Sequence, residues 1–586
     1  MMGTLNRSEL QRPVVLQRIT LGGMLFLLIL SIAATLRFGL LAALPLNTDE
    51  ARQALEAWQY WQPAERSTIS TGVSPAYFTF TTILFAFLGA SDTVARLAPA
   101  MFGFLVVALP WLWRSRLGTA GALATSALLA VSPTMGMVST KAGGEAMAIA
   151  ATLLLFISWS RFREEGAQHW LVVAAGALGF GLATAPLFYS ALLTLAVAWF
   201  VQRALDLPDS ESPSGDGAGV SQQRARLLLA CTGLIFLLIA TFFLWRPAGI
   251  GHAATQIARW LAQFDLTGGI QALALPILAL GRYELIVVTL GAAAIVWASW
   301  RGYGLPLFLV YWFAAALLLL LLQQGTLTNV LLLVLPSYLL LGLWLNHALS
   351  RPAGDVRWAL VLAVLILGAI AYFNGARYLR VMTSAPQQLG FLFLTFVALA
   401  SAFVAINFVR SWDRGAAYQG ALVGILLLFV IYSWGTTRWM LAEGGNDPRE
   451  YWVQSAGDDD LRTLARILEE ISWQSTGTAR ELDVLVAVNF PTLRWYLRDF
   501  PNTIVGDTVP PGSTQHAIIT RTGEDVLAPG DNYLGSDLGL AHTGVSTTVD
   551  APVTLTDTLR WWLFHEHSAT ILGERIILWA RSDVLQ

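Results

Sequence analysis

The chain has 586 residues, of which 55% are hydrophobic and 13% are charged, and its mean hydropathy is +0.59. These values exclude a soluble protein, and the formal net charge of −2 argues against a nucleic-acid partner. The only cysteine, Cys231, lies inside an apolar run, so the chain can form neither an intramolecular disulfide nor a cysteine metal cluster. The sequence indicates no cofactor, and it does not point to a divalent metal.

Apolar stretches recur from Leu21 to about Met440. They predict a polytopic α-helical membrane protein with about thirteen transmembrane helices. The stretches lie at about 21–45, 93–113, 119–138, 146–160, 170–186, 187–202, 227–244, 284–300, 305–322, 329–349, 357–373, 388–409 and 417–436. The first follows three arginines, which places the N-terminus in the cytoplasm by the positive-inside rule. An odd number of spans then places the C-terminus outside the cell membrane.

The connecting segments add detail to this topology. Residues 46–92 form a long outer loop, in which Pro75 to Leu88 is apolar but short for a span and predicts an interfacial or re-entrant helix. Gly89 ends this helix, and Ser91 or Asp92 caps the next one. Residues 203–226 are rich in proline, serine and glycine and predict a flexible cytoplasmic loop. Residues 245–281 form another outer loop with room for a membrane-surface helix.

The composition changes after about Glu443. Residues 1–440 are therefore expected to form the transmembrane domain, and residues 441–586 a small extracytoplasmic α/β domain. Its predicted helices lie at 458–471 and 491–498, and its predicted strands at 483–489, 517–520 and 575–580. His565 and His567 alternate in this domain, but without another clustered ligand they do not favour a metal site.

Asp49 and Glu50 stand together where the first span leaves the membrane. Behind them a helix-forming run places Leu55, Trp58 and Trp61 on one face, which suits a helix in the membrane interface. One interpretation is purely local, because Asn47 three residues before Glu50 predicts a capping box. The other is chemistry on a lipid headgroup. The two are compatible, since a capped helix can also aim a carboxylate.

Two further outer segments converge on this pair in the predicted topology, namely Asp92 to Arg96 and Lys141 to Glu145. Carboxylates at a bilayer boundary are costly unless paired or solvated, which makes them candidate functional groups. A carboxylate can act as general base, and cations can hold a departing phosphate. Structural alternatives stay open. Arg96 can pair with Asp92, Glu145 can be a first-turn acid, and Lys141, the only lysine, can be a snorkelling anchor.

The motifs in this region resemble those of a known family. Asn47-Thr48-Asp49-Glu50-Ala51-Arg52 is similar to the Asp-Glu motif in the first outer loop of GT-C glycosyltransferases of family 39, the protein O-mannosyltransferase and aminoarabinose-transferase type. Ser74 to Tyr77, Gly89 to Ala100 and Ser132 to Glu145 follow in the family's order. In the C-terminal domain, the segments 446–450, 495–501 and 559–562 resemble the flippase-activity-associated branch of archaeal-type N-glycosylation.

The resemblance implies an inverting transferase that moves a sugar from a polyprenyl-phosphate donor to a protein, lipid or glycan acceptor of the cell envelope. Asp49 would be the base, and Glu50 would bind the acceptor or orient the site. The substrate-binding candidates are Arg52, Arg96, Lys141, Glu145, Arg246 and Arg259; the last two can also contact lipid headgroups. Gly143 and Glu145 depart from the family's arginine and aspartate. A noncatalytic flippase or flippase-associated protein that handles lipid-linked sugars is therefore the alternative.

Overall fold

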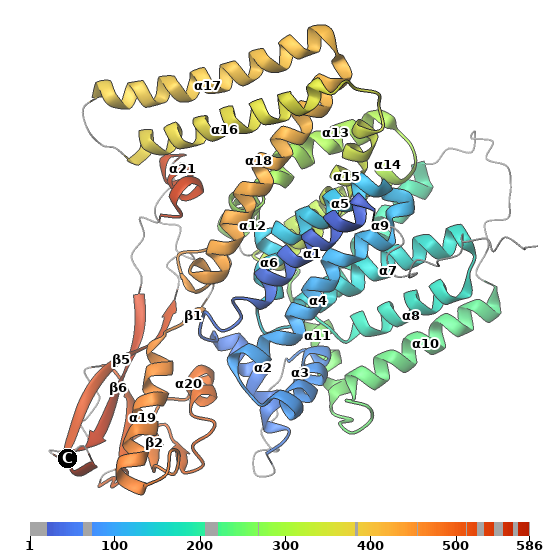
Figure 1. The fold of residues 1–586 in the computed structure, drawn as a ribbon. Coiled ribbons are helices and arrows are strands. Elements are labelled where there is room, and N and C mark those ends of the chain that lie inside the picture. The colour runs from blue at the N-terminus through green and yellow to red at the C-terminus, as the bar shows by residue number, and fades with distance from the viewer. Residues whose placement is uncertain are drawn as a thin grey trace, which may run out of the picture.

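The computed structural model describes residues 20–62, 73–205, 221–265, 267, 269–380, 385–453, 455–510, 512–523, 532–543, 555–566 and 572–584. The basic N-terminus and most of the predicted loop at 203–226 lie outside these residues. Within them the chain forms a large helical body and a six-stranded sheet (Figure 1).

Ten described helices are long and apolar enough to cross a membrane, or up to twelve spans are present if each of two bent helix pairs counts as one. The chain is thus a multi-pass membrane protein, as predicted. The ten helices are α1 (Leu21–Phe38), α4 (Asp92–Leu112), α7 (Glu145–Glu165), α9 (Pro186–Leu205), α10 (Gln222–Ala240), α14 (Gly304–Leu322), α15 (Val330–Leu349), α16 (Val356–Arg380), α17 (Ala385–Trp412) and α18 (Arg414–Ala442).

The first bent pair coincides with the predicted span at 119–138, whereas the second begins before the predicted span at 284–300. Helices α5 (Arg114–Val131) and α6 (Pro133–Ser139) bend by 63°, at a proline that cannot continue the hydrogen-bond ladder of α5. Helix α12 (Gly269–Tyr283) bends by 101° into the short π-helix η2 (Val287–Gly291) and α13 (Ala292–Arg301). The prediction that residues 245–281 form an outer loop is therefore wrong for 269–281, which belong to α12.

The predicted spans differ from the structure in two other places. The expected span at 170–186 is α8 (Gln168–Leu182), which has 15 residues and is short for a crossing. The expected outer loop at 245–281 contains α12 and also the amphipathic helix α11 (Gly249–Ala262), so the predicted surface helix is present.

The segment between α1 and α4 holds two short helices, α2 (Thr48–Gln59) and α3 (Pro75–Leu88). The bounds of α3 match the predicted ones because local signals set them. The Ser74 side chain accepts the N–H of Tyr77, and Gly89 ends the helix with a φ of +79°. Ser91 then caps α4. The two ends of α3 are therefore fixed by its own sequence.

Helix α15 lies at the centre of the helical body, and 83% of its most apolar 18-residue segment is buried. It approaches α5 so closely that a Cβ atom on Gly121 would lie 2.7 Å from the carbonyl oxygen of Gly342. Only glycine permits this backbone contact. Helix α17 is mostly exposed, because only 6% of its corresponding segment is buried. It lies with α16 at the edge of the body (Figure 1).

The six strands form one mixed sheet with the order β1-β5-β6-β4-β2-β3. Strand β2 pairs in parallel with β3 and β4, and the other pairs are antiparallel. The strands are β1 (Ser455–Gly457), β2 (Val484–Val486), β3 (Thr503–Val505), β4 (Ala517–Arg521), β5 (Tyr533–Thr543) and β6 (Leu572–Arg581). We call these strands, with helices α19 (Asp460–Thr476) and α20 (Pro491–Tyr496), the sheet domain.

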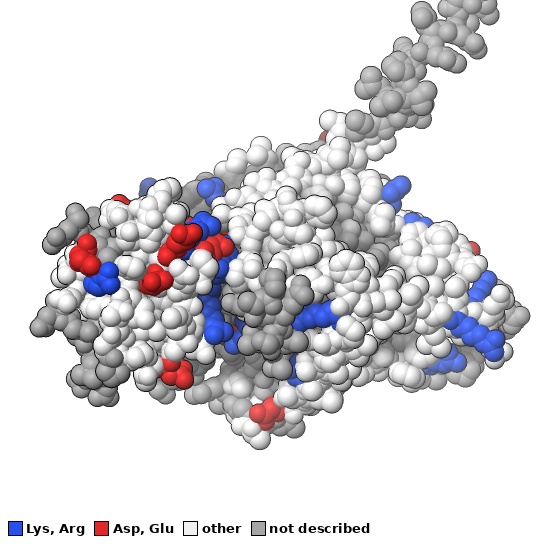
Figure 2. Space-filling view, turned by 90° about the horizontal axis from the view of Figure 1, so that it is seen from below, with Lys and Arg blue, Asp and Glu red and all other residues white. Residues whose placement is uncertain are grey.

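The predicted α/β character of this part is confirmed, as are its two helices and three of its strands. Strands β1, β3 and β5 were not predicted. One helix that follows β5 in the chain lies elsewhere: α21 (Leu555–Phe564) lies beside α16, where Tyr372 donates its hydroxyl to the carbonyl of Leu563 at 3.3 Å. Seen from below, acidic side chains gather over the sheet domain, whereas mainly basic ones mark the far end of the helical body (Figure 2).

Candidate active site

The first turn of α2 is built by a capping box. The Asn47 side chain accepts the N–H of Glu50 at 2.9 Å, and the Glu50 carboxylate accepts the N–H of Asn47 at 3.1 Å. This confirms the local interpretation of the acidic pair. It also fixes the direction in which Asp49, the residue between them in this turn, leaves the helix.

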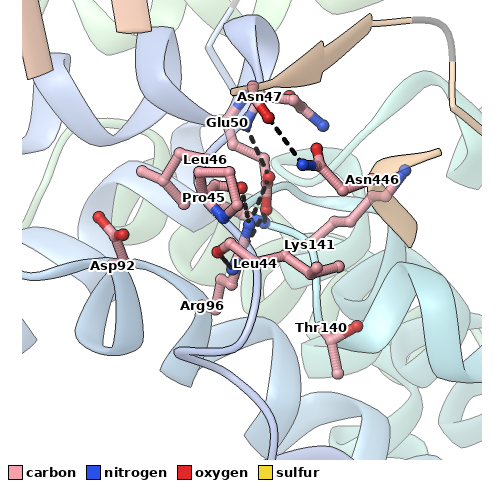
Figure 3. A network of polar contacts seen from close by, with 12 residues as sticks. Leu44, Pro45, Leu46, Asn47, Glu50, Asp92, Arg96, Thr140, Lys141 and Asn446 are labelled. Carbon is pink, nitrogen blue, oxygen red and sulfur yellow. Dashed lines mark hydrogen bonds and ion pairs between the residues drawn. The ribbon is translucent and has the colours of Figure 1, made fainter. Parts of the chain in front are cut away.

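Glu50 is the hub of a buried network (Figure 3). Besides the Asn47 N–H, its two oxygens accept the Nε and Nη2 hydrogens of Arg96 at 2.9 and 2.8 Å, and the N–H of Ala142 at 2.8 Å. These four bonds use the whole acceptor capacity of a carboxylate. Burial alone would raise the pKa of Glu50, but the Arg96 charge and these hydrogen bonds outweigh it and hold that pKa below its ordinary value.

Arg96 is saturated as well. Its remaining N–H groups donate to the carbonyl oxygens of Leu41, Leu44 and Pro45 at 2.6–2.9 Å. The three predicted segments do converge, because Glu50 joins α2 to α4 and to the loop before α7. The pairing differs from the expected ones, however, since Arg96 holds Glu50 rather than Asp92. The donors and acceptors of the two side chains are all used within the protein, which fits the expectation that Glu50 orients the site and leaves no N–H group of Arg96 for a substrate.

Asp49 has the opposite environment. Its side chain is 71% exposed, and its nearest ion-pair partner is Arg52 at 3.6 Å, which is itself 43% exposed. Asp49 lines a cavity of about 370 Å³ together with Glu50, Lys141 and Glu145. The adjacent carboxylates therefore differ in environment, because protein donors occupy the Glu50 oxygens whereas the Asp49 side chain is exposed.

Lys141 lies in the loop between α6 and α7 and donates to the carbonyl oxygen of Trp452 at 3.0 Å. Burial lowers the pKa of this ammonium, although the nearby Glu50 charge opposes the shift. The departures at Gly143 and Glu145 are linked, because a Cβ atom on residue 143 would lie 2.4 Å from the Glu145 carboxylate. The loop therefore accommodates Glu145 at the cavity by having no side chain two residues earlier.

The other predicted cations lie outside this cavity. Arg246 pairs with Glu56 of α2 at 2.6 Å and lies over the ring of Phe78, 4.1 Å from its centroid. It therefore joins α2 to α3 within the protein, which differs from its expected role in binding phosphate. Arg259, in the last turn of α11, is exposed, and its charge interacts with Glu145. Arg259, like Arg52 beside Asp49, is therefore a predicted cation that lies near the cavity without being among its lining residues.

The sheet domain docks on the same region through Asp92. Arg462, Trp495 and Tyr496 all donate to the Asp92 carboxylate, at 2.8, 2.8 and 3.0 Å. Trp495 and Tyr496 are thus residues of the domain contact. Among the described residues, no group of three or more histidine, cysteine, aspartate or glutamate side chains is arranged to hold a metal ion.

Comparison with known proteins rests on structure alone, since no family model and no curated protein sequence matches the chain. The crystal structure of ArnT from Cupriavidus metallidurans bound to undecaprenyl phosphate superimposes with a TM-score of 0.52 over 83% of this chain and 86% of that one, at 16% identity. The chain has the GT-C fold. The apo ArnT structure gives a TM-score of 0.49 over 80% of this chain and 84% of that one, also at 16% identity. An Archaeoglobus fulgidus oligosaccharyltransferase tethered with an acceptor peptide gives 0.44 over 83% and 63%, at 12% identity.

Within this GT-C body the cavity has walls that the sequence did not reveal. They include Gln53 of α2, the turn Gly325 to Thr328 before α15, and Trp452 and Ser455, which follow α18. An available signal for Trp452 was the aromatic pair Tyr451-Trp452, which follows the polar segment 443–450 after the last apolar stretch.

Proposed function

We propose that this protein is an integral-membrane glycosyltransferase, which transfers a sugar from a polyprenyl-phosphate donor to a cell-envelope acceptor with inversion of the anomeric centre. The observation that carries the proposal is the exposed Asp49 carboxylate, which lines the same cavity as the Lys141 ammonium. The GT-C fold supports it, as does the polyprenyl phosphate bound by ArnT, a protein of this fold.

In this reaction Asp49 takes the proton from a hydroxyl or amide group of the acceptor. The acceptor atom attacks the anomeric carbon and forms the new glycosidic bond. The bond between that carbon and the phosphate oxygen breaks, and its electron pair leaves with polyprenyl phosphate. Lys141, with Arg259 nearby, stabilises the negative charge of the leaving phosphate. Glu50 and Arg96 take no part in the chemistry and hold α2 in place.

The orientation proposed with this function places the sheet domain outside the cytoplasm and the N-terminus inside. Two observations support it. Asp92 and Glu145, which begin α4 and α7, lie at the end of the body next to the sheet domain. Arg116 and Arg161 lie at the other end, with ion pairs to Glu164 and Glu165. The basic end is the one that the positive-inside rule keeps in the cytoplasm. A cysteine added to the sheet domain of a Cys231→Ser protein should react with an impermeant maleimide in intact cells.

The test of the function uses the full-length protein in lipid nanodiscs with radiolabelled polyprenyl-phosphate sugars. Release of polyprenyl phosphate and sugar incorporation into envelope acceptors are both followed. We expect turnover in the wild type, and its collapse in Asp49→Asn with folding intact. Turnover that persists in Asp49→Asn would place the base elsewhere. Retained lipid-sugar binding without turnover for any donor or acceptor would favour the noncatalytic, flippase-associated alternative.

A further inference from the structure

Two residues that line the Asp49 cavity carry buried polar atoms without a hydrogen-bond partner among the described residues. They are the side-chain oxygen Oε1 of Gln53 and the indole nitrogen Nε1 of Trp452. Trp452 is 8% exposed, so its N–H is withdrawn from bulk solvent. A buried polar group that bonds to nothing destabilises the protein that contains it, so such groups at a cavity wall indicate a ligand that completes them.

Other contacts identify the unpaired atom of Gln53 and hold the backbone of Trp452. The Gln53 amide nitrogen donates to the carbonyl oxygen of Ala142 at 3.3 Å. Because a carbonyl can only accept, the amide cannot be turned round, and Oε1 is the atom left over. The Trp452 backbone is held by the hydrogen bond from Lys141 to its carbonyl oxygen. The wall therefore carries one acceptor, Oε1 of Gln53, and one donor, Nε1 of Trp452, that have no partner among the described residues.

A hydroxyl group is the chemistry that fits this pair, because it donates to Oε1 and accepts from an indole N–H. A sugar ring carries several such groups. Three more hydroxyls line the same cavity, those of Thr326, Thr328 and Ser455. The volume of about 370 Å³ lies in the ordinary range for small-molecule sites. Neither Gln53 nor Trp452 is charged, so this wall selects hydroxyls rather than a carboxylate or phosphate.

We propose that Gln53 and Trp452 form a carbohydrate subsite that binds the hydroxyl groups of a sugar ring next to Asp49. The inference rests on the proposed function, since it places the sugar beside the base and the phosphate beside Lys141. It adds the residues that distinguish a sugar-bearing lipid from the bare lipid phosphate. The sugar can be that of the donor or the terminal ring of a glycan acceptor, and both have the same chemistry.

The test compares the affinity of the nanodisc-embedded protein for polyprenyl-phosphate sugar with its affinity for sugar-free polyprenyl phosphate. Trp452→Phe removes the N–H and keeps an aromatic ring, and Gln53→Met removes the amide at similar length. We expect each to weaken binding of the sugar-bearing lipid about fivefold to tenfold, the value of one hydrogen bond, and to leave binding of the bare lipid unchanged. The matched control is Trp113→Phe, because Trp113 is a buried tryptophan whose indole N–H is also unpaired among the described residues, far from this cavity.

The outcomes separate the two proposals. Unchanged donor affinity with a fivefold to tenfold higher KM for a glycan acceptor would support the subsite and assign it to the acceptor. Selective loss of donor binding in a protein without turnover would support the subsite and overturn the transferase. Equal effects on both lipids, or no effect on either lipid or on the acceptor KM, would overturn the subsite.

Discussion

Tyr496 of the sheet domain donates its hydroxyl to the carboxylate of Asp92, the first residue of α4, at 3.0 Å. The same hydroxyl oxygen accepts the backbone N–H of Leu46 at 3.1 Å. Leu46 directly precedes Asn47, the cap of the helix that carries Asp49. One phenol group therefore connects the sheet domain both to the helix that contributes Arg96 and to the helix that contributes Asp49.

Tyr496→Phe should lower kcat several-fold, because it removes the hydrogen bond that fixes the backbone just before the α2 cap. The KM for the donor should change little, since Tyr496 does not line the cavity. We also expect a loss of about 1–2 kcal/mol in the free energy of unfolding, from two lost hydrogen bonds at one oxygen. Steady-state kinetics and thermal unfolding in nanodiscs measure these effects.

The control for this variant is Tyr533→Phe. The hydroxyl hydrogen of Tyr533 is shared between the carbonyl oxygens of Ser513 and Gln515, and both acceptors lie just before β4 of the sheet domain. It should lower stability to a similar extent and leave kcat unchanged. If the two variants lose kcat equally, the effect of Tyr496 reflects general destabilisation and not positioning of α2.

The adjacent carboxylates Asp49 and Glu50 should respond oppositely to loss of charge. Asp49→Asn should lower turnover by about 100-fold or more, the usual contribution of a general base, and change stability by less than about 0.5 kcal/mol because the side chain is exposed. Glu50→Gln should lower the free energy of unfolding by about 3–5 kcal/mol, since it leaves Arg96 buried without its counter-charge. Turnover and thermal unfolding are measured on the same preparations.

The matched control is Glu164→Gln, which breaks a pair with the half-exposed Arg116 at the opposite end of the body. Because exposed pairs contribute about 0–1 kcal/mol, it should change neither readout appreciably. If Glu50→Gln is fully stable but inactive while Asp49→Asn is active, then Glu50 is the base and Asp49 is not.

The parts of this fold that short-range chemistry decides could be predicted. Pro75 and Gly89 determine the ends of α3, and Asn47 with Glu50 determines the start of α2. The Leu461 and Leu464 face of α19 likewise follows from helical spacing, and both side chains are fully buried. In each case the residues that set the structure lie within a few positions of each other.

The parts that long-range packing decides could not be predicted. The Asp92 contact joins residues about four hundred positions apart, so the sequence suggested only a neighbouring arginine as its partner. Trp452 reaches the cavity because α18 ends beside Lys141. The bend before η2 has no proline or glycine at its break, and Glu284 at this break accepts hydrogen bonds from Ser132 and Thr134 at the start of α6 and from Tyr338 of α15. Pattern and propensity do not specify such contacts.

Binding of polyprenyl phosphate should weaken at alkaline pH because of Lys141. Burial lowers the pKa of this group below its ordinary value of 10.5, against the attraction of Glu50. The protonated ammonium attracts the lipid phosphate, so affinity should fall as the pH rises through the lowered pKa of Lys141. A guanidinium keeps its charge to higher pH, so Lys141→Arg should move this decline upward. Titrations with polyprenyl phosphate at pH values from about 7 to about 11 measure this fall in affinity.

The control ligand is the uncharged polyprenol, whose binding should not follow this pH dependence because it has no phosphate for Lys141 to attract. An identical decline in the wild type and in Lys141→Arg would assign it to a different group. The same comparison separates a role in phosphate binding from a snorkelling anchor, since an anchor would leave both lipids equally affected.

Glu284 occupies the bend between α12 and η2 and is 1% exposed. One of its oxygens accepts the hydroxyls of Ser132 and Thr134 at 2.6 and 2.5 Å, and the other accepts the hydroxyl of Tyr338 at 2.5 Å. It thereby ties the bend to the start of α6 and to the middle of α15. Because α6 leads directly into Thr140 and Lys141, this carboxylate helps to place the Lys141 loop.

Glu284→Gln should therefore lower the free energy of unfolding by about 1–3 kcal/mol, because the new amide group presents hydrogens where the carboxylate accepted them. Tyr338→Phe removes the opposite partner, and the double variant should lose less than the sum of the two single losses, by about 0.5 kcal/mol or more. Ser337→Ala is the control, because among the described residues that hydroxyl bonds to the carbonyl of Leu333 in its own helix and to no other group. Additive losses in thermal unfolding would show that Glu284 and Tyr338 act independently, and polyprenyl phosphate binding unchanged in Glu284→Gln would show that the bend does not position Lys141.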